Sequence, residues 1–317
     1  MSVFSDIQRP VVVQARTVVA DGVVALDLAP TNGRPLPPWT PGSHIDLLLA
    51  GGLERQYSLC GDPADRTTYR VAVLREPDGR GGSAAVHDDL RVGDTLRLRG
   101  PRNHFAFDAV SDRPTVFVAG GIGITPMLSM LAAADAAGAA WELHYAGRSR
   151  STMAFVEALV AAHPGRVHVY AADEGSRLDV DTLAVGDAGR VFCCGPRRLL
   201  DATEAAVSAV PGWTAHAERF EARTFGPPVW SEPFDIELAI TGTTLTVEPG
   251  RSILEVVEDS GAVVVSSCRV GTCGSCETPV LEGSVEHRDS VIGPDGGGTT
   301  MMICVSRAAG PSLVLEL

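Results

Sequence analysis

The sequence predicts a multidomain protein: an antiparallel β-barrel, then an α/β doubly wound domain, then a small α+β domain. Three observations support this order. Short β-branched runs separated by Gly and Pro fill the first ~108 residues, strands and helices alternate after Pro114, and a Pro-rich segment at Thr224–Pro233 precedes a new pattern. We therefore expect domains at residues 1–108, 109–224 and 234–317, with residues 225–233 as a linker. The length of 317 residues suits two or three domains.

The first domain is expected to contain short strands and one helix. The helix is predicted near Ser83–Leu90, and alternating or β-branched residues predict the strands. The predicted strands are Val11–Ala15, Val23–Leu28, His44–Leu49, Tyr69–Leu74 and Thr95–Arg99, together with the strand that Arg55–Leu59 closes.

The second domain is expected to be a parallel sheet with helices on both faces. Thr115–Ala119 is apolar without alternation, as in a strand that is buried on both sides. The further predicted strands are Trp141–Tyr145, Val167–Tyr170 and Arg190–Cys193. The predicted helices are Met127–Ala136, Met153–His163 and Pro196–Val210.

The third domain begins with a predicted hairpin, Phe234–Ile240 and Thr243–Val247. Ser252 and Glu255 have the spacing of a capping box, so a short helix should begin there and end near Gly261. Two strands, one helix and the cysteine-rich loop that follows indicate a small α+β module.

Composition excludes several classes of protein. The net charge of −13 would repel nucleic acid. No apolar run approaches the ~20 residues that span a bilayer, and Met1–Pro10 lacks the pattern of a secretory signal. We therefore expect a cytoplasmic protein with no nucleic-acid or membrane partner. The seven cysteines do not resemble a secreted disulfide framework, since Cys60, Cys193 and Cys194 are scattered.

The other four cysteines carry the most specific signal. Cys268, Cys273 and Cys276 have the spacing C-x4-C-x2-C, and Cys304 follows at a distance. This is the ligand spacing of plant-type [2Fe-2S] clusters. Gly271 and Gly274 allow a loop that wraps a cluster. A zinc site is the alternative, although zinc more often takes paired C-x2-C elements.

Two weaker signals lie in the predicted barrel. Arg55-Gln56-Tyr57-Ser58 offers an arginine, an aromatic ring and a hydroxyl, which can pair with a phosphate, cover a flat ring and hydrogen-bond a ring nitrogen. Gly81-Gly82-Ser83 precedes the predicted helix and offers bare amides to an anion. Either signal alone can be an ordinary strand end or loop.

A nucleotide-binding signal follows the first strand of the second domain. Gly120-Gly121-Ile122-Gly123-Ile124-Thr125-Pro126-Met127 joins a buried strand to a helix, so its glycines can let the backbone approach a pyrophosphate. Cys194-Gly195-Pro196 ends another strand at the same sheet edge. Arg148-Ser149 lies where the adenine ribose is usually distinguished. An arginine there favours a 2′-phosphate and hence NADPH, although a basic loop is often only solvated.

Together these motifs resemble the phthalate dioxygenase reductase family, which includes vanillate O-demethylase reductases. Its members combine the ferredoxin-NADP reductase superfamily fold with a C-terminal plant-type ferredoxin. The resemblance covers nearly the whole chain and implies a flavin domain, a nicotinamide domain and a β-grasp ferredoxin domain. It implies FMN, a [2Fe-2S] cluster and NAD(P)H as cofactors.

The resemblance also implies roles for individual residues. Arg55 and Ser83, with Gly81 and Gly82, would hold the flavin phosphate, while Tyr57, Ser58, Ala72 and Val73 would line the flavin ring. The nicotinamide nucleotide would bind at Gly120, Gly121, Gly123, Thr125, Pro126, Arg148, Ser149, Cys194, Gly195 and Pro196. Ser58, Cys194, Glu218 and Phe220 would take part in the redox chemistry, Phe220 by guarding the flavin face. The cluster ligands would be Cys268, Cys273, Cys276 and Cys304.

The resulting hypothesis is an oxygenase reductase, expected as a monomer. It would pass electrons from NAD(P)H through FMN and the cluster to a Rieske-type aromatic oxygenase or demethylase. A haem-thiolate monooxygenase is the alternative acceptor, and a non-catalytic redox-sensing module is the alternative class. Acidic residues near the cluster loop, Glu277, Glu282 and Glu286, would dock a basic partner surface.

Overall fold

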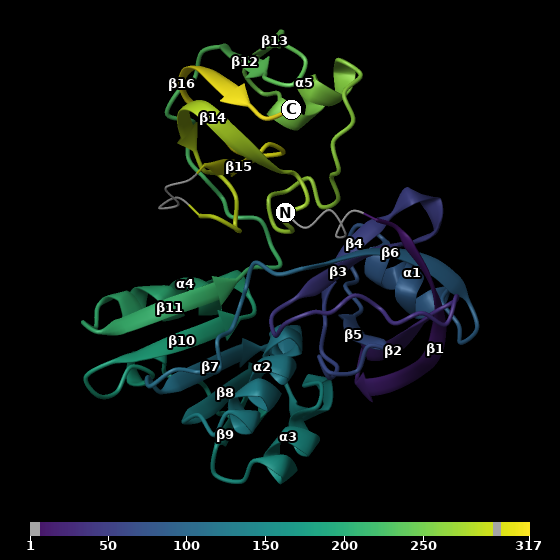
Figure 1. The fold of residues 1–317 in the computed structure, drawn as a ribbon. Helices are drawn as coiled ribbons and strands as arrows, with labels where there is room; N and C mark the ends of the chain where they lie inside the picture. Colours follow the sequence, from purple (N-terminus) through teal and green to yellow (C-terminus); the bar gives the residue numbers. More distant parts are fainter. Residues whose placement is uncertain (1–6, 294–298) are drawn as a thin grey trace. The chain divides into compact units, whose positions relative to one another are not determined.

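The computed structural model describes residues 7–293 and 299–317. Residues 1–6, which belong to the N-terminal segment considered above, lie outside the described part. The chain divides into two compact units, Met1–Glu218 and Arg219–Leu317 (Figure 1). Within the described residues, no helix is both long and apolar enough to cross a membrane.

The first unit begins with a six-stranded antiparallel sheet in the order β4-β3-β6-β1-β2-β5. A bridge between Leu59, just after β4, and Val71 in β5 links the two edges of this sheet. The antiparallel barrel is therefore confirmed. Its elements are β1 (Arg9–Ala20), β2 (Val23–Pro30), β3 (His44–Leu48), β4 (Glu54–Ser58), β5 (Tyr69–Leu74), α1 (Gly82–Asp88) and β6 (Thr95–Arg102).

The same unit continues as a five-stranded parallel sheet in the order β11-β10-β7-β8-β9. Its elements are β7 (Thr115–Gly120), α2 (Ile124–Ala136), β8 (Trp141–Gly147), α3 (Val156–Ala162), β9 (Val167–Ala171), β10 (Gly189–Cys194), α4 (Arg197–Ser208) and β11 (Trp213–Glu218). The doubly wound fold is confirmed. β11 was not predicted, because this edge strand mixes Thr214 and His216 with alanines and lacks an apolar run.

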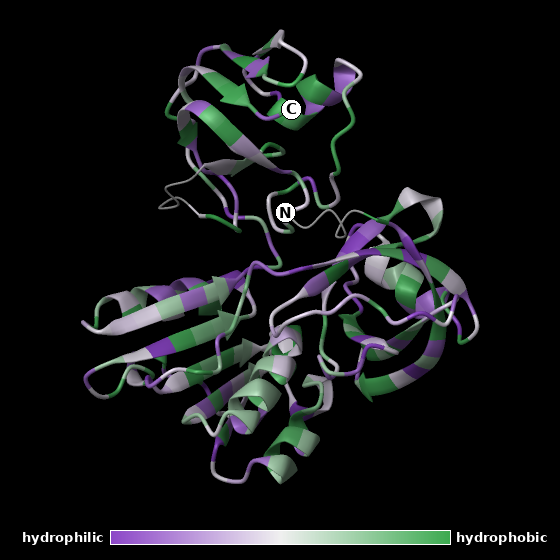
Figure 2. Cartoon of the chain, viewed as in Figure 1, coloured by the Kyte–Doolittle hydropathy of each residue, from purple (hydrophilic) through white to green (hydrophobic). Residues whose placement is uncertain are grey.

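Alternate residues of the central strand β7 enter cores on opposite faces of the parallel sheet. Phe117 packs with residues of α2 and α3, whereas Val118 packs with residues of α4. This explains why β7 is hydrophobic along most of its length (Figure 2). Phe105 and Phe107, which follow the barrel, belong to the first of these cores. The Phe107 ring lies 5.1 Å from Phe192 of β10, centre to centre, so barrel and parallel sheet share one core.

The second unit is a five-stranded mixed sheet in the order β13-β12-β16-β14-β15 with one helix, as expected for a β-grasp module. The capping box is confirmed, because the Ser252 hydroxyl accepts from the Glu255 amide and the Glu255 carboxylate accepts from the Ser252 amide. Three strands after the cysteine loop were not predicted. The elements are β12 (Phe234–Leu238), β13 (Thr243–Val247), α5 (Ile253–Asp259), β14 (Glu277–Glu286), β15 (Thr300–Met302) and β16 (Arg307–Leu315).

Candidate functional site

The cysteine loop brings its four thiols together in the second unit. Cys268 interacts with Cys273 and Cys304, and Cys276 interacts with Cys304. All four are buried and none forms a disulfide. The donor set of four neighbouring thiols therefore fits a [2Fe-2S] cluster, which the sequence predicted.

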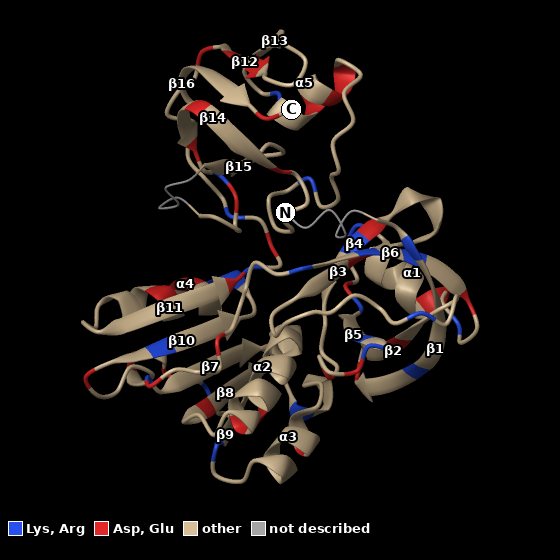
Figure 3. Cartoon of the chain, in the orientation of Figure 1, with Lys and Arg blue, Asp and Glu red and all other residues tan. Residues whose placement is uncertain are grey.

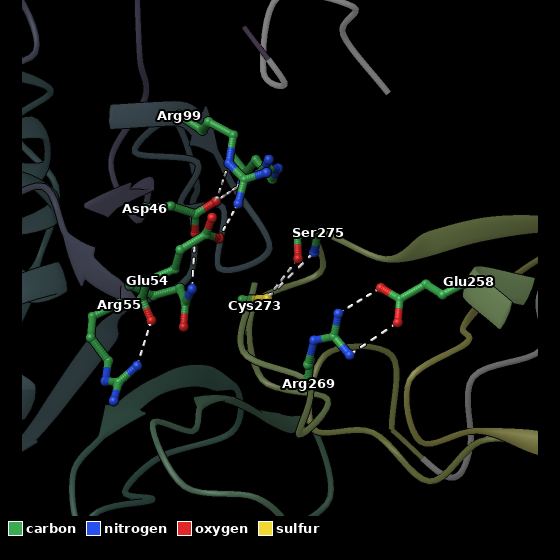
Figure 4. Close-up of polar contacts among 10 residues, drawn as sticks. Asp46, Glu54, Arg55, Arg99, Glu258, Arg269, Cys273 and Ser275 are labelled. Atoms are coloured by element: carbon green, nitrogen blue, oxygen red, sulfur yellow. Dashed lines mark hydrogen bonds and ion pairs between the residues drawn. The ribbon is translucent and has the colours of Figure 1, made fainter. Parts of the chain in front are cut away.

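Backbone N–H groups point at two of these sulfurs. The amides of Val270 and Thr272 donate to Cys268 Sγ at 3.4 and 3.3 Å, and the Ser275 amide donates to Cys273 Sγ at 3.5 Å. The Ser275 hydroxyl also lies 3.1 Å from Cys273 Sγ (Figure 4). Such donors stabilise a thiolate and tune the potential of a bound cluster.

The shape of the cysteine loop depends on residues around it. Gly271 has φ +73°, and a Cβ there would lie 2.5 Å from the Val305 side chain. Arg269 also has a positive φ of 56°, and its guanidinium pairs with both carboxylate oxygens of Glu258 (Figure 4). This ion pair ties the loop to α5.

Asp289 supports the same loop, and the sequence motif did not reveal it. Its Oδ1 accepts hydrogen bonds from the amides of Val291 and Ile292 at 2.9 and 2.6 Å, and its Oδ2 accepts from the Ser306 hydroxyl. The next residue, Ser290, donates its amide to the Gly271 carbonyl. Asp289 lies 13 residues beyond Cys276, outside the C-x4-C-x2-C motif. Only a longer motif could have predicted its role in holding the loop.

In the first unit, the structure brings together the two weak barrel signals. The Arg55 side chain lies over the turn at Gly81-Gly82-Ser83, and its guanidinium donates to the carbonyls of Glu54 and Arg80. A Cβ on Gly82 would lie 2.3 Å from Arg55 Cγ, so a larger residue there would displace the Arg55 side chain. Arg80, the residue before this turn, places a second positive charge near Arg55. The Ser83 hydroxyl accepts a hydrogen bond from the Glu76 amide.

Beside this turn, β4 presents Tyr57 and Ser58. Burial raises the pKa of Tyr57 to about 12, so the phenol is neutral at physiological pH. The Ser58 hydroxyl is buried and has no hydrogen-bond partner among the described residues. An orphaned buried hydroxyl beside an aromatic ring fits a site that a polar flat ring completes. Ala72 and Val73 of β5 are buried as well.

Glu218, Ser58 and Cys194 lie close together in the first unit. Burial raises the pKa of Glu218 to about 8, and the nearby Ser58 hydroxyl offsets part of this shift without reaching hydrogen-bond geometry. Glu218 ends β11 directly beside Cys194, its partner in β10. Burial, followed by the charge of Glu218, raises the pKa of the Cys194 thiol. Cys194 is therefore a neutral thiol, and its side chain is fully buried.

The glycine-rich turn and the Cys194-Gly195-Pro196 turn pack directly against each other. A Cβ on Gly123 would lie 2.2 Å from the Cys194 carbonyl oxygen, and one on Gly195 would lie 2.8 Å from Gly120 Cα. Gly121 has φ +54° and open space around it, so its need for glycine is conformational. The two predicted nucleotide motifs therefore form one edge at the carboxyl ends of β7 and β10, where open α/β sheets bind ligands.

The helix after the glycine turn begins earlier than predicted, at Ile124 instead of Met127. Thr125 and Pro126 therefore belong to its first turn. Proline is tolerated there because backbone N–H groups of the first turn have no hydrogen-bond partner within the helix. The Thr125 hydroxyl donates to the Ile122 carbonyl at 2.9 Å. Tyr145, which sequence reasoning missed, donates its hydroxyl to the carbonyls of Gly121 and Ala154, both at 3.1 Å.

The loop after β8 contains two arginines with different surroundings. Arg150 forms ion pairs with Glu157 and Glu174 at 3.3 and 3.0 Å. Arg148 is exposed, and its guanidinium makes no ion pair or hydrogen bond within the described part of the chain. The hydroxyl of Ser149 lies near those of Ser151 and Thr152. Arg148 is thus the arginine in this loop that is available to an anion.

Phe220 belongs to the second unit, two residues beyond Glu218, and is 43% exposed. Its predicted position against a flavin therefore stays a prediction.

The comparisons with known proteins identify the family of the chain. A family model described as the 2Fe-2S iron-sulfur cluster binding domain matches residues 236–309. The chain is 42% identical over 303 residues to the phenoxybenzoate dioxygenase subunit beta of Ectopseudomonas oleovorans, covering 94% of each chain.

Solved structures are similar over almost the whole chain, and two of them are described here. One is a phthalate dioxygenase reductase, described as a modular structure for electron transfer from pyridine nucleotides to [2Fe-2S], with 36% identity, a TM-score of 0.71 and 98% of each chain covered. The other is an intact type IV self-sufficient cytochrome P450 monooxygenase, with 45% identity and a TM-score of 0.92. The match covers 98% of this chain but only 41% of that enzyme. The chain therefore belongs to the phthalate dioxygenase reductase family of NAD(P)H-dependent flavin and iron–sulfur oxidoreductases.

Proposed function

We propose that this protein passes electrons from NAD(P)H through FMN and a [2Fe-2S] cluster to a Rieske-type aromatic oxygenase or demethylase. The observation that carries this proposal is the set of four neighbouring buried thiols. The same chain also packs its glycine-rich turn against Cys194-Gly195-Pro196 and places Arg55 over the turn at Gly82. When bound, FMN would accept one hydride, which carries two electrons, and would release those electrons one at a time, so it can connect a nicotinamide to a one-electron cluster.

The barrel residues would bind and orient the flavin. Arg55 would pair with its phosphate at the Gly81-Gly82-Ser83 turn, where the missing Cβ of Gly82 leaves room for the Arg55 side chain. Tyr57 would cover the ring, and the orphaned Ser58 hydroxyl would hydrogen-bond a ring nitrogen. Ala72 and Val73 would exclude water from the ring edge. Since the Glu218 carboxyl is neutral below about pH 8, it can donate a hydrogen bond in the same crevice.

The α/β residues hold the nicotinamide nucleotide. The pyrophosphate lies on the glycine turn at the start of α2, and Thr125 and Pro126 fix the first turn of that helix. Cys194, Gly195 and Pro196 border the nicotinamide, and Phe220 guards the flavin face. Arg148 with Ser149 reads a 2′-phosphate, which makes NADPH the preferred donor.

The cluster residues are Cys268, Cys273, Cys276 and Cys304, on a domain that we assign to residues 234–317. We assign the flavin domain to residues 1–108, the nicotinamide domain to residues 109–224 and the linker to residues 225–233. The protein acts as a cytoplasmic monomer that meets its oxygenase transiently.

The family resemblance favours a Rieske-type acceptor, and the relatives named for aromatic dioxygenases support it. A haem-thiolate monooxygenase is the second candidate, because the similar P450 structure carries this type of reductase in the same chain as its haem domain. Reconstituted turnover with purified oxygenases of each class distinguishes the two. The acceptor is the class that supports product formation coupled to NAD(P)H consumption.

The electron route is tested with the purified holoenzyme and two artificial acceptors. Ferricyanide can take electrons directly from the flavin, whereas cytochrome c reports on the cluster. Cys276→Ser should abolish cytochrome c reduction and leave ferricyanide reduction largely intact. Cys60→Ser is the matched control, because Cys60 is a buried thiol in the barrel, and it should change neither rate.

Two outcomes would contradict the proposal. Equal loss of both activities in Cys276→Ser, with flavin content unchanged, would refute the order flavin then cluster. Failure of the wild-type holoenzyme to reduce either acceptor with NADH or NADPH would refute the reductase function itself.

A further inference from the structure

A cluster of possible metal ligands lies outside the electron route, on the parallel sheet. Glu142 and His144 are alternate residues of β8 and therefore lie on the same face of the sheet. His168 of β9 is the strand partner of His144. One ligand atom from each of the three side chains lies within 4.8 Å of the others. None of these residues has a role in the proposed function.

The spacing of the ligand atoms suits one ion. Glu142 Oε1 lies 3.3 Å from His144 Nε2, and Glu142 Oε2 lies 3.5 Å from His168 Nε2. Zinc bonds of about 2.0–2.2 Å at tetrahedral angles separate neighbouring ligand atoms by roughly 3.3–3.6 Å. Since the three ligand atoms lie within 4.8 Å of one another, side-chain rotations can bring them around one zinc ion.

His144 is already oriented as a ligand. Its Nδ1 hydrogen-bonds the Tyr170 hydroxyl at 2.9 Å, which leaves Nε2 as the atom that faces Glu142. The side chain is 10% exposed, and Nε2 is enclosed without a hydrogen-bond partner among the described residues. A metal-binding histidine normally has its second nitrogen fixed by such a partner.

The other two ligands leave a path for the ion. The side chains of Glu142 and His168 are both 43% exposed, and β9 is the edge strand of the sheet. An ion can therefore reach the site from solvent, and a fourth ligand can come from water.

We propose that Glu142, His144 and His168 bind one Zn²⁺ ion, with Tyr170 as the residue that positions His144. Two imidazoles and one carboxylate form a common zinc ligand set, and three protein ligands leave one position open. None of the three ligands belongs to the glycine turn, so zinc binding and electron transfer use different residues of the chain.

Equilibrium dialysis of the holoenzyme against Zn²⁺, with metal analysis, tests the site. Wild type should bind one equivalent more than His168→Ala, and the midpoint for that equivalent should lie in the micromolar range or below. Tyr170→Phe keeps the ring but removes the hydroxyl, and it should weaken binding by about 10–100-fold. His163→Gln removes an imidazole that pairs with Asp135 on another element, so it should bind zinc as wild type does.

Flavin and cluster absorbance show whether each variant is folded, and Glu142→Gln replaces His168→Ala if that variant is not. Zinc should also raise the Tm of wild type by mass action but not that of the ligand variant. Equal zinc content in wild type and the folded ligand variants would overturn the proposal. So would binding that saturates only at millimolar zinc. Either result would leave the electron route untouched.

Discussion

Glu218 shows how burial sets the charge of one residue near Cys194 and Ser58. In the folded protein its pKa is about 8, above the ordinary value of 4.5, because burial disfavours the carboxylate. The folded state therefore holds a proton that the unfolded state releases between pH 4.5 and 8. As a consequence, the free energy of unfolding falls as pH rises through this interval and levels off above pH 8.

Replacing Glu218 with the neutral Gln should remove this loss of stability at high pH. We expect Glu218→Gln to be more stable than wild type at pH 8.5 by about 1–3 kcal/mol, less than the full shift implies because the residue is only partly buried. The difference should vanish below pH 4.5. Thermal unfolding between pH 4 and 9 measures it, and the exposed Glu221→Gln serves as the control. A pH-independent difference would argue against a neutral carboxyl.

Arg148 is the residue that we propose to select the nicotinamide nucleotide. Arg148→Ala should raise the KM for NADPH by about 10-fold or more, since a charge-assisted contact with the 2′-phosphate is lost, and should leave the KM for NADH nearly unchanged. Arg150→Ala is the matched control, because Arg150 already pairs with two glutamates. Equal effects of Arg148→Ala on both nucleotides would show that this loop does not read the phosphate.

At the scale of elements, the cysteine loop owes its shape to neighbouring segments more than to its own regular structure. Asp289 satisfies amides of the segment that follows it and also binds Ser306, just beyond Cys304. A buried carboxylate with several hydrogen bonds couples these segments, and removing it leaves several donors unsatisfied.

Asp289→Ala should therefore loosen the cluster loop. We expect it to destabilise the second unit by about 3 kcal/mol and to lower the temperature at which cluster absorbance is lost. Flavin binding should be unchanged. Asp259→Ala is the control, because Asp259 forms an exposed ion pair with Arg251 worth at most about 1 kcal/mol. Similar behaviour of the two variants would mean that Asp289 does not anchor the loop.

At the scale of the whole molecule, the net charge of −13 is the property that a partner meets first. Acidic residues occur in both units (Figure 3). Of the three glutamates predicted to dock a partner, Glu286 is already engaged, since it accepts from the Val229 amide and pairs with Arg288. Glu277 accepts from the Thr300 hydroxyl, so the exposed Glu282 is the best remaining candidate.

Electron transfer to a cationic acceptor should therefore depend on salt. We expect the rate of cytochrome c reduction to fall by about 10-fold between low and high ionic strength, because screening weakens the attraction between opposite charges. Reduction of the anionic ferricyanide should not fall and serves as the control. Rates that fall equally for both acceptors would point to a general effect of salt on the enzyme.

Sequence patterns predicted the elements whose residues repeat or cluster, such as β7, α2, the capping box of α5 and the four cysteines. They failed where an element depends on distant partners. β14 contains Gly283 and Pro279, and its strand conformation comes from pairing with β15 and β16. The support given by Asp289 and Tyr145 is equally invisible in a motif, because each acts through a hydrogen bond that only the fold creates.

The core that joins the barrel to the parallel sheet has a consequence for how such proteins evolve. Phe105 and Phe107 are buried by residues of both layers, so neither layer could be exchanged for a foreign one without exposing aromatic surface. The cluster-binding unit fills its core entirely with its own residues, from Trp230 to Leu317. Gene recombination should therefore transfer the barrel and the parallel sheet together. The iron–sulfur domain, in contrast, can be added, moved or lost as a separate unit.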